Sequence, residues 1–147
     1  PKVPIFVPED TPFEIGKALL LQEGTDVSIF ATGHLVWEAV EAARALAKDG
    51  LSVELINIHT IKPLDKESIL SSVAKTKCVV TAEEHQVAGG MGESIAQLLA
   101  NNHPVPMEFI AVNDKFGESG KPADLMKKYG LHSSDIIKAT HRVLKRK

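Results

Sequence analysis

Short apolar segments alternate with longer segments of helical period along most of this chain, and this alternation limits the folds open to it. Four apolar segments predict strands: "DVSIFAT" at 26–32, "LSVELINI" at 51–58, "KCVVTAEE" at 77–84 and "PMEFIAV" at 106–112. Segments with apolar residues at helical spacing lie between them, at 35–48, at 62–76 and after the glycines at 89–92. Strands that alternate with helices predict a mostly parallel sheet with helices on both faces.

A further apolar segment, "KALLLQ" at 17–22, comes before the first of these strands. The link "EGTD" at 23–26 is short and rich in turn residues, so the two segments predict a hairpin of antiparallel strands. The predicted fold is therefore one three-layer α/β/α domain. Its sheet is mixed and five-stranded, and its first strand is antiparallel.

The helix boundaries have their own signals. Gly50 predicts the end of the helix at 35–48, and Asp65 predicts the N-cap of the next one. Two helices close the chain. One is predicted to begin near Pro122 and end at Gly130, and Ser133 in "HSSD" is predicted to cap the other.

Composition narrows the function classes. The chain has 147 residues, enough for one domain with a core, and its formal charge of −2 offers no basic field for nucleic acid or acidic lipid. The histidines show no metal-ligand spacing, and Cys78 lies alone in an apolar run, which favours a structural thiol in a reducing compartment. Neither a membrane span nor a signal peptide is visible, so a cytoplasmic location is predicted. The proline-rich residues 1–16 are interpreted as an extended linker and residues 17–147 as the domain.

Candidate site residues lie in the loops that follow the predicted strands, where α/β proteins usually bind ligands. The loops "TGH", "HTIKP" and "EEHQVAGG" hold six candidates: His34, His59, Glu84, His85, Gly89 and Gly90. Together with Lys62 in the second loop, this set could bind an anion or transfer protons. It could equally form a strand–helix turn whose charges, Glu83 and Glu84, face water. The glycine spacing matches neither GxGxxG nor the phosphate loop, and no nucleophile is marked beside Glu84 and His85.

Three longer motifs carry a family resemblance. "HTIKPLD", "EEHQVAGGMGESIAQLL" and "VNDKFGESGKPADLMKKYGL", in this order and spacing, resemble the C-terminal domain of transketolases over about residues 17–144. The same domain occurs in deoxyxylulose-phosphate synthases and in the β-chains of 2-oxo acid dehydrogenase decarboxylases. "SGKPADLMKKYGL" favours transketolase. Gly33-His34 departs from the Gly-Ser or Gly-Val pair usual in the family.

The resemblance implies a five-stranded mixed sheet with an antiparallel first strand, in agreement with the pattern above. It also implies a dimeric enzyme of the pentose phosphate pathway. That enzyme moves a two-carbon ketol unit between sugar phosphates with thiamine diphosphate and a divalent metal. In the family these groups are held by a domain with a Gly-Asp-Gly motif, which this sequence lacks, and a glutamate of a second domain activates the cofactor.

The resemblance therefore predicts no catalytic, cofactor-binding or metal residue in this chain. The chain is expected to support assembly with the pyrimidine- and diphosphate-binding domains and to be inactive alone. The six candidates become residues of a strand-end crevice or a domain interface. Two alternatives stay open: the C-terminal domain of a 2-oxo acid dehydrogenase β-chain, and a free-standing module that binds an anion or nucleotide.

Overall fold

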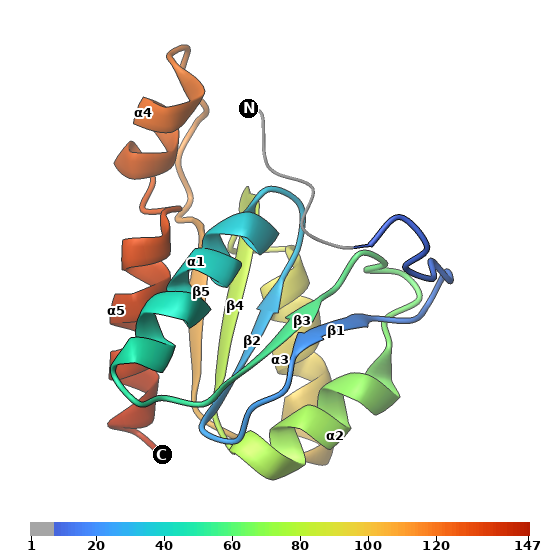
Figure 1. Ribbon diagram of the computed structural model, residues 1–147. Coiled ribbons are helices and arrows are strands. Elements are labelled where there is room, and N and C mark those ends of the chain that lie inside the picture. Colours follow the sequence, from blue (N-terminus) through green and yellow to red (C-terminus); the bar gives the residue numbers. More distant parts are fainter. Residues whose placement is uncertain (1–7) are drawn as a thin grey trace.

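The computed structural model describes residues 8–147 as a five-stranded sheet between two layers of helices (Figure 1). The sheet order is β1-β3-β2-β4-β5, and β1 is antiparallel to β3 while the other pairs are parallel. The strands are β1 (Leu19–Gln22), β2 (Val27–Ala31), β3 (Val53–Asn57), β4 (Val79–Gln86) and β5 (Met107–Val112). The helices are α1 (Leu35–Lys48), α2 (Lys66–Thr76), α3 (Met91–Asn102), α4 (Pro122–Lys128) and α5 (Ser133–Leu144). The predicted fold class is confirmed.

The predicted hairpin is wrong, because β1 and β2 do not pair. β3 lies between them, and the link between β1 and β2 crosses the beginning of β3. Gly24 makes this crossing possible, since a Cβ atom there would lie 2.1 Å from the carbonyl carbon of Val53. The backbone N–H groups of Thr25 and Asp26 then donate to the carbonyl of Ser52 at 3.1 and 2.8 Å.

Each face of the sheet has its own core. Side chains from β2, β3, β4 and β5 pack against α1 and α5 on one face, with Ile29, Leu46 and Ile136 fully buried. On the other face, Phe30, Ile69 and Ile95 pack between the sheet and α2 and α3. Alternate residues of a strand point to opposite faces, so Ile29 and Phe30 belong to different cores.

The helix boundaries agree with most of the predictions. α1 ends before Gly50, whose φ is +82°, and α4 has Pro122 at its beginning and Gly130, at φ +70°, shortly after its end. The N-cap of α5 is His132 and not Ser133, since Ser133 is already helical. The amide N–H of Ser133 instead donates to Glu38 on α1 at 2.7 Å, which joins the two helices.

Residues 8–16 contain no helix or strand. The rest of the predicted linker, residues 1–7, lies outside the described part of the chain, so the boundary at residue 16 stays a prediction. Within residues 8–147, no helix is long and apolar enough to cross a bilayer.

Candidate functional site

The carboxyl ends of β2, β3 and β4 border a crevice made of two adjoining hollows. Thr32 and Gly33 line both hollows, whose volumes are about 370 and 430 Å³. All six predicted site residues lie along this crevice: Glu84, His85, Gly89 and Gly90 on one side, and His34 and His59 on the other. The structure therefore brings together residues that are more than fifty positions apart.

Glu83, not Glu84, occupies the centre of the corner between β4 and α3. Its side chain is only 2% exposed. Its carboxylate accepts hydrogen bonds from the backbone N–H groups of Met91, at 2.7 Å, and Gly92, at 2.8 Å. A negative charge at this place also meets the positive end of the α3 dipole. The interpretation that Glu83 faces water is wrong, because its buried carboxylate accepts hydrogen bonds from N–H groups in the first turn of α3.

Two of the three glycines of the corner make room for buried side chains. Gly90 has φ −86°, which any residue can adopt, but a Cβ atom there would lie 2.6 Å from both carboxylate oxygens of Glu83. At Gly92 a Cβ atom would lie 2.6 Å from the hydroxyl of Thr81. Gly89 differs, since no atom crowds it and its φ of +78° is the reason for glycine.

Glu84 also accepts a backbone hydrogen bond at the beginning of a helix, on the opposite face of the sheet. Its carboxylate accepts from the backbone N–H of His34 at 3.2 Å and lies 2.8 Å from Nδ1 of the same histidine. His34 is the residue before α1, so Glu84 braces the beginning of that helix. Consecutive residues of β4 point to opposite faces, and for this reason Glu83 and Glu84 reach helices in different layers.

This arrangement limits the chemistry of the crevice. Two helices begin beside it. The Glu83 carboxylate already accepts from two N–H groups at the beginning of α3, and the Glu84 carboxylate accepts from the N–H of His34 before α1, so these groups are not open to an anion. Nδ1 of His85 lies 3.0 Å from the carbonyl of Gln86, and Nδ1 of His59 lies 3.0 Å from the hydroxyl of Thr60. Among residues 8–147, no serine or cysteine lines either hollow.

Thiamine diphosphate and its metal do not fit the described residues. The α3 N-terminus, where a diphosphate could have met backbone N–H groups, holds the Glu83 carboxylate. Across residues 8–147, no three His, Cys, Asp or Glu side chains are grouped closely enough to hold a metal ion. The sequence has no Gly-Asp-Gly motif.

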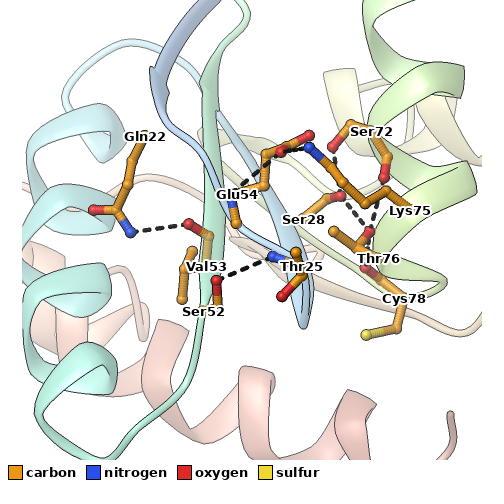
Figure 2. Close-up of polar contacts among 11 residues, drawn as sticks. Gln22, Thr25, Ser28, Ser52, Val53, Glu54, Ser72, Lys75, Thr76 and Cys78 are labelled. Carbon is orange, nitrogen blue, oxygen red and sulfur yellow. Dashed lines mark hydrogen bonds and ion pairs between the residues drawn. The ribbon is translucent and has the colours of Figure 1, made fainter.

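A second polar cluster lies at the amino end of the sheet, and the sequence pattern gave no sign of it (Figure 2). The hydroxyl of Ser28 on β2 lies 2.6 Å from those of Ser72 and Thr76 on α2. Beside them, the Glu54 carboxylate on β3 pairs with Lys75 and accepts from the N–H of Gly24 at 3.3 Å. The cluster thus joins two strands, a helix and the crossing link.

The charge state of Glu54 follows from these contacts. Burial raises the pKa of the carboxyl, but hydrogen bonds from Lys75, Ser72 and Gly24 outweigh burial, so the pKa lies below its usual value of 4.5. Nearby, Cys78 is buried and free, and its thiol donates to the carbonyl of Asp26 at 3.3 Å. Burial raises the pKa of this thiol, which suits a structural role.

Asp65 is the N-cap that the sequence predicts. Its carboxylate accepts from the N–H of Ser68 at 3.1 Å and from the Ser68 hydroxyl at 2.8 Å. It also accepts from the N–H of Ala18 at 2.8 Å, and this contact ties the residue before β1 to α2. Burial raises the pKa of Asp65, but these three hydrogen bonds more than compensate, and the pKa lies below 3.8.

The geometry agrees with comparisons to known proteins. The family model described as "Transketolase, C-terminal domain" matches residues 16–136. A subunit of the 6-deoxy-6-sulfo-D-fructose transketolase of Clostridium sp. (strain MSTE9) is 48% identical over 95% of this chain and 43% of its own length. The putative transketolase C-terminal section of Methanocaldococcus jannaschii is 40% identical over 94% of this chain and 43% of its own length.

A solved structure, that of a split gene transketolase described as an inactive β4 tetramer, matches with a TM-score of 0.95. It is 40% identical, and the match covers 99% of this chain and 48% of that one. The chain belongs to the transketolase C-terminal domain family. It spans less than half the length of these relatives.

Proposed function

We propose that this chain is the C-terminal part of a transketolase and that it supports assembly without taking part in the chemistry. The complete enzyme would transfer a two-carbon ketol unit between sugar phosphates, with thiamine diphosphate and a divalent metal. The cofactor would supply the carbanion chemistry, as it does wherever it is bound. Such transfer would place the enzyme in the pentose phosphate pathway of the cytoplasm.

The observation that carries this proposal is the commitment of Glu83 and Glu84 to backbone N–H groups. Hydrogen bonds within the chain already take up both carboxylates, which argues against an acid–base role for either of them. The partners would then be the pyrimidine- and diphosphate-binding domains, within a homodimer of the full enzyme. Family membership and the β4 tetramer of a 40% identical relative support association with further transketolase chains.

A reconstitution experiment tests the proposal. The chain alone, given a ketose donor, an aldose phosphate acceptor, thiamine diphosphate and magnesium, is expected to show no ketol transfer and no cofactor binding by calorimetry. Joint expression with the domains that carry the Gly-Asp-Gly motif is expected to produce transfer. Turnover by the chain alone, or micromolar affinity for thiamine diphosphate, would contradict the assembly role. Binding to an acyltransferase core would instead indicate a 2-oxo acid dehydrogenase β-chain.

A further inference from the structure

The hollow on the α1 side of the crevice has an uncharged lining. Its volume is about 430 Å³. Among residues 8–147, no acid, lysine or arginine lines it, whereas Glu83 and Glu84 line the adjoining hollow. We call it the Asn57 hollow. Its side chains come from the ends of β2 and β3, from the beginning of α1 and from the loop after β3: Thr32, His34, Val36, Trp37, Asn57 and His59.

Two polar side chains of the Asn57 hollow are not used by the fold. They are the hydroxyl of Thr32, directly after β2, and the amide of Asn57, the last residue of β3. Both residues are half-buried, and within residues 8–147 neither side chain has a hydrogen-bond partner. A hydroxyl donates one hydrogen bond and accepts two, and an amide donates two and accepts two. Both groups are therefore open to a ligand.

Two histidines line the same hollow, and each has one ring nitrogen already engaged. Nδ1 of His34 lies 2.8 Å from the Glu84 carboxylate, and Nδ1 of His59 lies 3.0 Å from the Thr60 hydroxyl. The Phe13 ring also packs on the His59 ring, with 4.4 Å between centroids. These contacts hold both imidazole rings in place and leave Nε2 of each as the nitrogen that a ligand can use. Polar groups held in this way lose little entropy on binding.

The lining selects a ligand by its charge and by the directions of its polar groups. An anion meets no cation in this hollow, and the Glu84 carboxylate beside His34 repels it. A planar heterocycle carries its polar atoms along its edge, whereas the open polar groups here come from β2, β3 and two loops. A sugar ring carries hydroxyl groups on several sides, and its C–H groups pack on apolar and aromatic surface such as that of Val36 and Trp37.

We propose that the Asn57 hollow binds an uncharged sugar. The Asn57 amide bridges two adjacent hydroxyl groups of the sugar, since it offers a donor and an acceptor side by side. The Thr32 hydroxyl and the Nε2 atoms of His34 and His59 bond to the remaining hydroxyl groups. This binding does not depend on the ketol transfer proposed above, so each can fail without the other.

Trp37 provides the measurement, because it is the one tryptophan of the chain and it lines the hollow. The fluorescence of this chain is titrated with D-ribose and D-glucose as uncharged probes, with D-ribose 5-phosphate as the charged probe and with adenine as the planar one. At least one of the two uncharged sugars is expected to give a saturable change with a millimolar dissociation constant. D-Ribose 5-phosphate and adenine are expected to bind about tenfold more weakly or not at all.

Variants locate the binding. Asn57→Ala is expected to weaken it about tenfold, by loss of the bridging amide, and to leave the melting temperature unchanged, because the amide has no partner within residues 8–147. Thr32→Val keeps the shape of the side chain, removes the hydroxyl and serves as a second variant if Asn57→Ala fails to fold. His85→Ala is the matched control, because His85 lines the adjoining hollow and not this one.

The outcomes decide between the uncharged sugar and other ligands. No saturable change with either uncharged sugar would overturn the proposal. Equal effects of Asn57→Ala and His85→Ala would overturn it as well, since the sugar would then bind elsewhere. Tighter binding of D-ribose 5-phosphate would mean that the hollow takes an anion, and tighter binding of adenine would mean that it takes a planar base.

Discussion

The two ends of the sheet use carboxylates in different ways. At the carboxyl end, Glu83 and Glu84 lie next to each other on β4 and satisfy the beginnings of α3 and α1. At the amino end, Glu54 accepts from Gly24 in a crossing link and pairs with Lys75 near the end of α2. The carboxylates at the first end accept from N–H groups at helix beginnings, whereas Glu54 at the second end holds the link that crosses β3.

The difference explains why a crevice at the usual ligand end need not be an anion site. In α/β sheets that bind anions, free helix N-termini supply the N–H groups. Here carboxylates of the chain itself accept from these groups, and Gly90 makes room for Glu83. The following changes test this contrast.

The largest effect is expected from Gly90→Val. The side chain would meet both carboxylate oxygens of Glu83, since even its Cβ atom would lie 2.6 Å from them, and it would displace them from the N–H groups of α3. Overpacking and lost hydrogen bonds together are expected to cost about 3 kcal/mol or more, which lowers the melting temperature by roughly 10 °C.

Gly89→Ala is the control, because it adds only the strain of φ +78° in open space. It is expected to cost about 1 kcal/mol. Melting curves that rank the two variants in the reverse order would contradict the close-packing explanation.

Glu83→Gln and Glu54→Gln compare the two ends of the sheet directly. The amide keeps the shape but presents N–H toward a backbone N–H of Met91 or Gly92, so about 2–3 kcal/mol of unfolding free energy is expected to be lost. Glu54→Gln is expected to cost about 1–2 kcal/mol, because Lys75 is half-exposed and the bond from Gly24 is longer. Urea unfolding of both variants gives the comparison. An equal or larger loss at Glu54 would mean that the amino end is the more tightly held.

Acid unfolding is expected to involve the amino-end cluster and Asp65. The folded-state pKa values of Glu54 and Asp65 lie below 4.5 and 3.8. Depressed carboxyl pKa values stabilise the fold above the unfolded-state values, and this contribution is lost as the pH falls through the folded-state values. The melting temperature is therefore expected to fall increasingly below about pH 4.5. Asp65→Asn, which removes one of the two groups, is expected to flatten this slope. An unchanged slope would show that other groups control acid unfolding.

The sequence predicted those parts of the structure that depend on local signals. Helical spacing and Gly50 give α1 its bounds, and the side chain of Asp65 caps α2 as predicted. The order of strands was missed, because the turn residues at 23–26 look the same whether a link closes a hairpin or crosses another strand. The one available signal was Gly24, whose role depends on the backbone of Val53 and so on a contact far away in sequence.

The sequence predicted which six residues meet at one edge of the sheet but not their contacts, and the role of that edge as a site stays a prediction. The six residues gather along the crevice because the carboxyl ends of parallel strands meet at one edge. The importance of Glu83 over Glu84 was missed, since the two are adjacent and chemically identical in sequence. Strand alternation assigns them to opposite faces, but only the path of the corner determines which carboxylate is enclosed.

The smallest effect is expected from Glu84→Gln, the counterpart of Glu83→Gln on the other face. The Glu84 side chain is partly exposed, so its contacts with His34 are expected to contribute less than about 1 kcal/mol. In the assembled enzyme, turnover is expected to stay within about tenfold of the parent, because loss of a positioned acid–base group typically costs ~10²–10⁴ in rate. His34→Ser is the matched variant, since it removes the same contact from the other partner. Steady-state turnover and melting curves of the two variants check the prediction. A hundredfold slower Glu84→Gln enzyme with an unchanged melting temperature would mean that Glu84 acts in the chemistry, and the corner would then have to be regarded as part of an active site.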